Sequence, residues 1–344
     1  MEDLIEKSQI RSSRKKEHIH NFLQGNFEGD NFFKYIYLEY NALPEIDFNE
    51  INTGCSFLGK KISFPVMINA MTGGFDKAIE INKNLATIAK SFNIPMAVGS
   101  QAIAVEDKAY EASFKVVREV IKDGLVISNI NAFATVEQVA RAIDMIEADG
   151  IQIHLNPAQE ICMPEGDRNF KGILKNIETI VRTIDKPVIV KEIGFGISKE
   201  VAKKLLEVGV KYIDVGGRGG TNFIQIESAR NEHFHFEELY QWGIPTALSL
   251  LECRALSEDL KLICSGGIKN AEDIVKALCV GADMVGISGP VLKTLLEGGY
   301  EAVEGYFENL IYKSKVIMLL LGKKSLEELR QVPYRVMGEL RELL

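Results

Sequence analysis

The segment HLNPAQE carries four side chains that can do chemistry within seven residues. They are the imidazole of His154, the carboxamides of Asn156 and Gln159, and the carboxylate of Glu160. One carboxylate without protein carboxylates beside it suits Mg²⁺, which keeps water ligands and takes phosphate oxygens from a substrate. A core histidine with satisfied hydrogen bonds is the alternative for His154. The density of polar groups favours a cluster that orients an anion or a metal.

Two further places concentrate positive charge. Lys191 ends the apolar run PVIVKE, where a lysine is costly to desolvate unless it meets an anion or works with a lowered pKa. The alternative is a lysine that reaches the rim of the fold. Near the N-terminus, Arg14, Lys15, Lys16 and His18 form either a solvated helix face or a clamp for a diphosphate.

The elements that must position these residues follow a repeating pattern. From residue 60 onward, eight short apolar runs alternate with amphipathic stretches, which is typical of βα units. The runs cover residues 64–69, 94–98, 125–128, 151–155, 188–191, 212–215, 262–264 and 284–287. They are almost continuously apolar, as expected for parallel strands covered on both faces. An open doubly wound sheet would more often have five or six strands and a glycine fingerprint after the first.

Eight βα units predict a single α/β domain, a TIM (β/α)8 barrel over residues 1–344. We expect an N-terminal extension over 1–60 that contributes to the active site, a barrel core over 61–290 and C-terminal helices over 291–344. Helices are expected at 78–92, 110–122, 136–148, 171–184, 199–207, 247–256 and 271–279. Thr135, Ser198 and Asn270 are suited to cap three of them.

Small and polar residues follow every predicted strand. In a TIM barrel these strand ends meet at one mouth, where catalytic and binding groups collect. A single glycine pair is most often only a turn. The consecutive loops Gly266-Gly267 and Ser288-Gly289 are more informative, because barrels bind phosphate there on backbone N–H groups and a helix N-terminus. The preceding loop GGRGGT adds the hydroxyl of Thr221.

Composition narrows the class of protein. Forty basic and forty-eight acidic side chains give a net charge of −8, which argues against a nucleic acid partner. The five cysteines form no zinc-ligand or CxxC spacing, so we expect free thiols in a reducing compartment. The start of the chain lacks a signal-peptide pattern, and the apolar run 316–321 is far shorter than the roughly 20 residues that span a bilayer. We expect a cytoplasmic protein without a membrane partner.

These motifs together resemble the type 2 isopentenyl-diphosphate delta-isomerases, FMN-dependent enzymes that interconvert isopentenyl and dimethylallyl diphosphate. The resemblance runs in order through RKKEH, FLGKKISFPVMINAMTGG, VGSQ, SNINA, HLNPAQE, KEIGFGIS, DVGGRGGTNF and SGGI. Some of these are generic to FMN barrels, whereas RKxxH combined with MTGG and HLNxxQE is specific. The resemblance implies a TIM barrel that binds FMN and Mg²⁺, NADPH as the flavin reductant, a small diphosphate substrate and a homo-oligomer (tetramer or octamer).

The resemblance also implies roles for individual residues. It places around FMN the residues Ala70, Met71, Thr72, Gly73, Ser100, Asn129, Lys191, Thr221, Gly266, Gly267, Lys269, Ser288 and Gly289. It directs to the substrate Arg14, Lys15, His18, His154, Asn156 and Gln159, and to Mg²⁺ Glu160. The chain departs from the family at two positions. Ala102 stands where an arginine is frequent, and Lys269 replaces another arginine, keeping the charge without the bidentate fork.

Moving a double bond by one carbon requires a proton to be added at one carbon and removed at another. An alkene is a very weak base, Gln159 has no acidic proton of useful pKa, and Glu160 is assigned to metal. Our hypothesis is that reduced FMN is the acid and base without net redox change. Lys191 would stabilise the anionic reduced ring, and Gln159 would orient the reacting carbons or shuttle the proton. Gln159, Lys191 and His154 are therefore the expected catalytic residues.

Three alternatives remain at this stage. An FMN-dependent 2-hydroxy-acid oxidase would need a histidine base near the sixth strand, where the local histidines are His233 and His235. An IMP-dehydrogenase-like enzyme would need a reactive cysteine in the GGRGGTNF loop, which has none. A non-catalytic phosphate-binding barrel would be colourless when purified.

Overall fold

The computed structural model describes residues 2–25, 29–231 and 233–344, and its centre is a closed barrel of eight parallel strands. The order around the barrel is β10-β11-β4-β5-β6-β7-β8-β9. The strands are β4 Val66–Ile68, β5 Met96–Ala97, β6 Val126–Asn131, β7 Gly150–Leu155, β8 Val188–Glu192, β9 Tyr212–Asp214, β10 Lys261–Ser265 and β11 Met284–Ile287. Each falls on one of the eight predicted runs. The predicted TIM barrel is confirmed.

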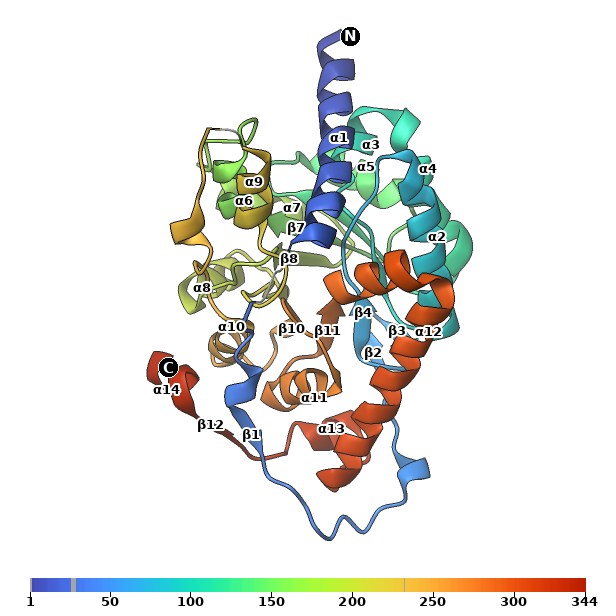
Figure 1. The fold of residues 1–344 in the computed structure, drawn as a ribbon, viewed down its shortest axis with the longest axis vertical. Coiled ribbons are helices and arrows are strands. Elements are labelled where there is room, and N and C mark those ends of the chain that lie inside the picture. Colours follow the sequence, from blue (N-terminus) through green and yellow to red (C-terminus); the bar gives the residue numbers. More distant parts are fainter. Residues whose placement is uncertain (1, 26–28, 232) are drawn as a thin grey trace.

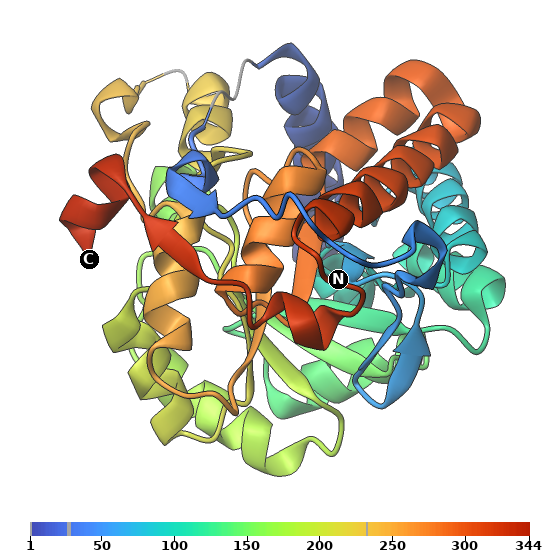
Figure 2. The same cartoon turned by 90° about the horizontal axis from the view of Figure 1, so that it is seen from below.

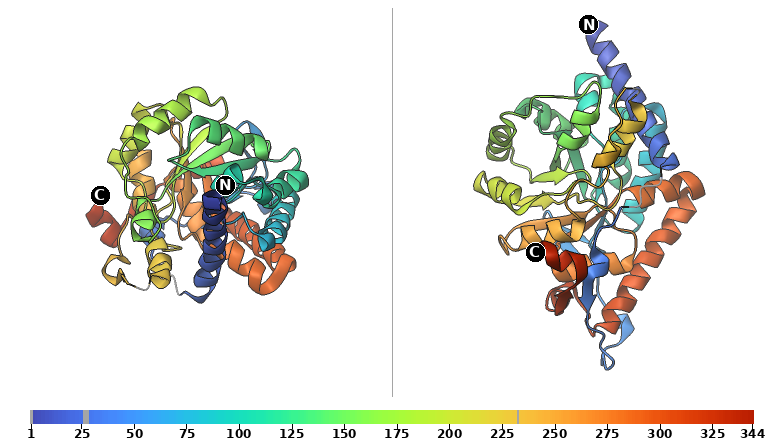
Figure 3. Two further views of the ribbon diagram at one scale, coloured as in Figure 1. Left: turned by 90° about the horizontal axis from the view of Figure 1, so that it is seen from above. Right: turned by 60° about the vertical axis from the view of Figure 1, so that its left-hand side comes forward.

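Helices surround the barrel on its outside, as the view from above in Figure 3 shows. They are α2 Asp76–Ser91, α4 Ala112–Ile121, α5 Val136–Met145, α7 Ile173–Thr183, α8 Lys199–Glu207, α10 Thr246–Arg254 and α11 Ala271–Val280. The predicted caps form: Thr135, Ser198 and Asn270 each accept a hydrogen bond from a first-turn backbone N–H. These caps fix where three βα loops end and their helices begin.

Three short helices and three 3-10 turns interrupt the loops. The helices α3 Ala102–Glu106, α6 Pro157–Cys162 and α9 Phe223–Arg230 follow β5, β7 and β9 at the mouth. The 3-10 turns η2 Phe48–Glu50, η3 Lys108–Tyr110 and η4 Glu237–Leu239 lie elsewhere. Sequence periodicity did not reveal α3, α6 or α9, because one or two turns are too short to show a helical repeat. They matter because α6 and α9 carry polar residues into the site.

The opposite end of the barrel is closed by a hairpin. Strands β2 Cys55–Phe57 and β3 Lys60–Ile62 pair antiparallel, and Phe57 and Ile62 are buried. They pack against Met67, Ile127 and Ile263 on the barrel strands. This apolar layer seals the base of the barrel, so the polar residues inside it open only toward the mouth.

The two ends of the chain pack on the outside. The N-terminal helix α1, Glu2–Gln24, stands over the mouth (Figure 1), followed by η1 Phe33–Tyr35 and β1 Ile36–Leu38. The tail contains α12 Gly289–Leu320, α13 Leu326–Leu329, β12 Tyr334–Val336 and α14 Gly338–Leu343. The predicted helical tail is confirmed with one addition, because β12 pairs antiparallel with β1 (Figure 2). None of the helices in the described parts of the chain has the length and apolar character needed to cross a bilayer.

Candidate active site

The carboxyl ends of the strands surround one cavity of about 1040 Å³. Its wall contains every residue predicted for the site except Gly73. A Cβ atom on Gly73 would lie 2.1 Å from the ring of Phe114, so glycine is needed there for packing. Residues from all eight strand ends and from α1 thus come together, as the barrel topology predicts.

At the mouth, the backbone of the Gly266-Gly267 loop packs directly against the backbone of the GGRGGT loop. Gly267 has φ +70°, and a Cβ atom there would lie 2.0 Å from the carbonyl oxygen of Gly219. Gly266 has φ +110°, and its Cβ would lie 2.1 Å from the carbonyl oxygen of Gly217. Close beside them α12 begins at Gly289, and the first N–H groups of a helix have no partner within it. Glycine backbone at the cavity wall and a helix N-terminus, at which Pro290 alone brings no N–H, make this corner suited to a phosphate.

Lys191 does meet an anion inside the barrel. Its Nζ lies 3.3 Å from Oδ2 of Asp214, and it donates a hydrogen bond of 2.8 Å to the carbonyl oxygen of Glu192. Both Lys191 and Asp214 are buried. Asp214 was not predicted, although the short apolar strand that it ends is a signal of the same kind as Lys191. Lys191 also lines the cavity.

His154 is held as a neutral ring. Its Nδ1 lies 2.9 Å from Oδ1 of Asn129. Burial lowers the pKa of His154 to about 3, and the positive charges of Lys191, Lys15 and Arg14 act in the same direction. The imidazole therefore carries no charge at neutral pH.

The rest of HLNPAQE turns from β7 into α6. Asn156 Nδ2 donates to Oε1 of Gln159 at 3.1 Å and to Oε1 of Glu160 at 2.8 Å. The second carboxylate oxygen of Glu160 accepts from the backbone N–H of Asp167 at 2.9 Å. Across the described residues, no three His, Cys, Asp or Glu side chains gather into a group that could hold a metal ion. Glu160 alone fits Mg²⁺ only where water and ligand oxygens complete the coordination.

One face of α1 closes the cavity from above. Arg11, Arg14, Lys15, His18 and Phe22 recur at helical spacing and all line the wall. Lys16 of the same cluster is exposed and does not line the wall, so the expectation that all three cations face the site is wrong for Lys16. Lys15 donates to the carbonyl oxygen of Ser100 at 2.8 Å. Burial lowers the pKa of Lys15 to about 7, with further contributions from Arg14 and Arg11.

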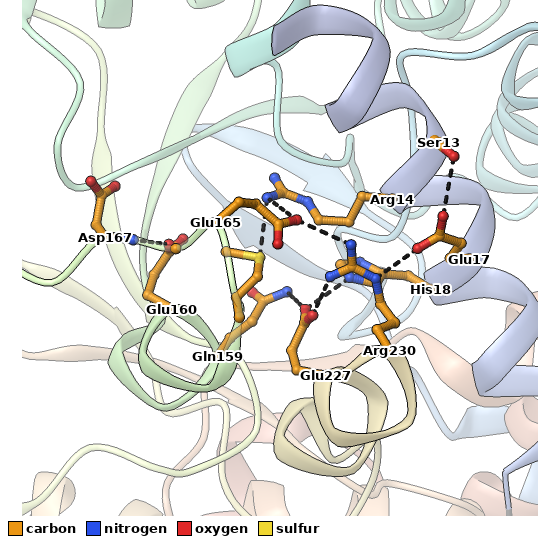
Figure 4. A network of polar contacts seen from close by, with 12 residues as sticks. Ser13, Arg14, Glu17, His18, Gln159, Glu160, Glu165, Asp167, Glu227 and Arg230 are labelled. Atoms are coloured by element: carbon orange, nitrogen blue, oxygen red, sulfur yellow. Dashed lines mark hydrogen bonds and ion pairs between the residues drawn. The ribbon is translucent and has the colours of Figure 1, made fainter. Parts of the chain in front are cut away.

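An ion-pair network that the sequence did not reveal fastens α1 to α9 and to the loop after α6 (Figure 4). Glu227 is fully buried and accepts from Gln159 Nε2 at 3.0 Å. His18 Nε2 lies 2.9 Å from Glu227, within ion-pair distance although off the line of a hydrogen bond. Arg230 contacts Glu227, Glu17 and Glu165.

The charge of Glu227 is compensated by this network. Burial alone would raise the pKa of Glu227, but His18, Gln159 and Arg230 together hold it below its ordinary value. The same carboxylate fixes the Gln159 amide, because its NH₂ group faces Glu227 while its oxygen faces Asn156. The site thus holds Gln159 in one orientation.

Comparisons with known proteins add an independent finding. A family model described as FMN-dependent dehydrogenase matches residues 156–335. A protein of Geobacillus sp. (strain WCH70) named isopentenyl-diphosphate delta-isomerase is 47% identical over 332 residues, covering 96% of this chain and 94% of that relative. A protein of the same name from Moorella thermoacetica is 42% identical over 334 residues, covering 97% and 96%.

Solved structures give a more distant likeness. A structure described as a putative lactate oxidase of Pediococcus acidilactici has a TM-score of 0.67 and 17% identity. It covers 95% of this chain, and this chain covers 94% of it. At this identity the likeness concerns the barrel fold alone.

Proposed function

Because the chain belongs to the isopentenyl-diphosphate delta-isomerase family, we propose that it interconverts isopentenyl diphosphate and dimethylallyl diphosphate at this cavity. Proton addition and removal would take place at reduced FMN, with Mg²⁺ holding the diphosphate. The observation that carries the proposal is the joining of Arg14, Lys15 and the HLNPAQE residues around one cavity in a chain so similar to those relatives.

The cavity fits FMN. The hydroxyl of Thr72 is buried in its wall without a hydrogen-bond partner among the described residues, so it is free for a ligand. The glycine loops and the start of α12 offer N–H groups for the phosphate, and Lys191 offers a positive charge for the ring. When bound and reduced, FMN supplies an exchangeable proton at N5.

The side chains at the cavity support a mechanism in which the flavin carries the proton and the protein groups orient the substrate. His154 is neutral with a pKa near 3, so it holds no proton to give to an alkene at neutral pH. Gln159 has no acidic proton, and Glu227 fixes its amide. Gln159 therefore orients the five-carbon group, and Lys191 holds a positive charge beside the ring.

The diphosphate is the handle that positions the reacting carbons, so its binding energy serves orientation. Arg14, Lys15 and His18 lie on the cavity face of α1, and Glu160 would hold Mg²⁺ opposite them. Ala102 stands where an arginine is frequent in the family, while Arg11 also lines the cavity and pairs with Glu106 on the helix that begins at Ala102. NADPH as reductant, a homo-oligomer (tetramer or octamer) and a cytoplasmic location complete the proposal.

The site does not support the alternative hypothesis of a 2-hydroxy-acid oxidase. His233 and His235 are exposed and lie outside the cavity wall. The histidine base that such an oxidase needs is therefore missing near the sixth strand.

The direct test combines a spectrum with turnover. We expect the purified protein to be yellow, and to convert isopentenyl diphosphate only with Mg²⁺ and after NADPH or dithionite has reduced the flavin under argon. The flavin spectrum should be unchanged after many turnovers, since no net oxidation occurs. Full turnover with the flavin kept oxidised would contradict the role of reduced FMN, and colourless inactive protein would contradict the function.

Glu160→Gln tests the metal assignment. The substitution keeps the shape and removes the charge, so we expect turnover to fall by at least about 100-fold, the upper end of losses seen around metal sites, while FMN stays bound. The measurement is kcat/KM against Mg²⁺ concentration. Glu165→Gln is the matched control for the Mg²⁺ dependence alone, because this carboxylate also lines the cavity but pairs with Arg230 and Arg14. Equal Mg²⁺ dependence in wild type and Glu160→Gln would remove Glu160 from the metal role.

A further inference from the structure

A chain of buried side chains crosses the barrel interior from Asp214 to His154. Asn69 Nδ2 lies 2.7 Å from Asp214 Oδ2, and Gln152 Nε2 lies 2.8 Å from Asn69 Oδ1. Asn129 Nδ2 lies 2.8 Å from Gln152 Oε1, and His154 Nδ1 lies 2.9 Å from Asn129 Oδ1. Asp214, Asn69 and Gln152 are each 0% exposed, so water does not compete for these contacts.

Two contacts of Asn69 fix the direction of every hydrogen bond in the chain: its Nδ2 faces Asp214, and its Oδ1 accepts from the backbone N–H of Ala70 at 2.9 Å. A carboxylate only accepts, so Asn69 must turn its NH₂ group toward Asp214 and its oxygen toward Gln152. Each contact is short enough to need one donor and one acceptor, so the same orientation passes along the chain. Asn129 then presents its oxygen to the ring of His154, which can meet it only with an N–H at Nδ1.

Donors surround both oxygens of the Asp214 side chain. Ser265 Oγ donates to Oδ1 at 2.5 Å, and the backbone N–H of Gly216 donates to the same oxygen at 3.3 Å. The ammonium of Lys191 lies 3.3 Å from Oδ2. A reversed chain would need a protonated Asp214 donating to Asn69, and Lys191 would lose its counter-ion. The observed set of donors excludes that arrangement on energetic grounds.

We propose that Asn69, oriented by Asp214 and by the backbone N–H of Ala70, is a positioning residue that acts through Gln152 and Asn129 to hold His154 in its Nδ1–H tautomer. The atom left for a ligand in the cavity is then Nε2, and it presents a lone pair. His154 is suited to accept a hydrogen bond from an N–H or O–H group. A phosphate oxygen can meet Nε2 only when a proton lies between them.

Neutrality of the ring makes the tautomer decisive. A doubly protonated ring would donate from both nitrogens whatever the chain dictates, but the pKa of His154 is lowered to about 3 by burial, then by Lys191, Lys15 and Arg14. The importance of His154 for turnover rests on the proposed function, whereas its tautomer does not. A spectroscopic readout therefore separates the two.

The test is magic-angle-spinning NMR of the purified protein, with its bound flavin, labelled with ¹⁵N-histidine. His154→Gln assigns the His154 signals among the five histidines of the chain. At pH 8 we expect one species with a protonated Nδ1 and an unprotonated Nε2. A protonated Nε2, or a mixture in the wild type, would overturn the proposal, whether or not the protein isomerises its substrate.

Variants identify the amide chain as the cause. Gln152→Leu cuts the chain in its middle and leaves Asn129 without a fixed acceptor, so we expect the single Nδ1–H species to shift to a mixture that includes Nε2–H. Asp214→Leu is the comparison, because the backbone N–H of Ala70 still orients Asn69, so the folded variant should keep the single species. If Gln152→Leu does not fold, Asn69→Leu removes the first amide and should give the same mixture. A single Nδ1–H species in a folded Gln152→Leu or Asn69→Leu variant would contradict the proposed role of the chain.

Discussion

Lys15 on the cavity face of α1 has a pKa lowered into the neutral range. Its ammonium lies 2.8 Å from the carbonyl oxygen of Ser100 and 5.3 Å from the centre of the Phe114 ring. Burial, then Arg14 and Arg11, lowers its pKa to about 7, so near neutral pH about half of the free protein carries it uncharged. A bound diphosphate would supply the missing negative charge and raise that pKa.

This coupling predicts a pH dependence of diphosphate binding. Below pH 7, Lys15 is charged with or without ligand, so its contribution is fully present. Between pH 7 and the higher pKa of the complex, binding must take up a proton, and affinity falls by up to about tenfold for each pH unit. We expect this fall in calorimetric titrations with inorganic pyrophosphate at pH 6.5, 7.5 and 8.5.

Lys15→Arg is the matched control, because arginine stays charged throughout this range. Titration of pyrophosphate itself affects both proteins equally, so the difference between their slopes reports Lys15. Identical slopes for wild type and Lys15→Arg would contradict the lowered pKa.

At the scale of elements, α1 is the helix that covers the mouth of the barrel. The helix shares contacts with α3 and α9, and its charged residues pair with both sides of the mouth. Arg11 pairs with Glu106 on α3, and Arg14 lies 3.5 Å from Glu165 in the loop after α6. Arg230 on α9 is the centre of this set, because it joins the buried Glu227 to Glu17 on α1 (Figure 4).

Arg230→Ala is expected to loosen α1 without emptying the flavin site. Removing one partner of a buried ion pair typically lowers the free energy of unfolding by about 3–5 kcal/mol. In Arg230→Ala the buried Glu227 would lose its partner, and this loss is reduced only if α1 moves away and lets water reach the carboxylate. We expect trypsin to cleave between Arg11 and Lys16 at least about tenfold faster. KM for the diphosphate should rise while the flavin spectrum stays unchanged.

Arg182→Ala is the control for this experiment. Arg182 also pairs with a glutamate one helical turn away, but its side chain is 71% exposed, and such pairs contribute little. Cleavage of α1 that is equally slow in Arg230→Ala and Arg182→Ala would show that the network does not hold the helix.

The strands and α1 show which parts of the fold and the site can be predicted from the sequence and which cannot. The eight strands were readable because a parallel strand buried on both faces must be apolar throughout. Strand ends then placed Lys191, Gln159 and Glu160 at one mouth. RKKEH could be assigned to that mouth only by resemblance, since a solvated helix face has the same charges. The acids that hold α1 and Lys191 were missed because their partners lie far away in the chain, as Asn69 and Asp214 do.

At the scale of the whole molecule, the segment after α1 pairs with the C-terminal tail away from the mouth. Ile36, Tyr37 and Leu38 of β1 pair with Val336, Arg335 and Tyr334 of β12. Neither strand has a sequence signal of its own, because each is only three residues long and half polar or exposed. Tertiary packing defines them: Phe33 and Ile36 are fully buried beside this pair, and α14 then places Leu340 in the same core.

Leu340→Ala therefore tests whether the tail is part of the fold or an appendage. Leu340 is 0% exposed in the penultimate turn of the chain, whereas Leu343 on the same helix is 53% exposed. Truncating a fully buried leucine to alanine typically lowers the free energy of unfolding by about 2–5 kcal/mol, while an exposed position changes it by about 0.5 kcal/mol or less.

Guanidinium unfolding followed by fluorescence should show a lower midpoint for Leu340→Ala and an unchanged one for Leu343→Ala. Flavin binding should survive in both at low denaturant, because the mouth lies at the other side of the barrel from the strand pair (Figure 1). Equal midpoints for the two variants would mean that α14 does not stabilise the barrel.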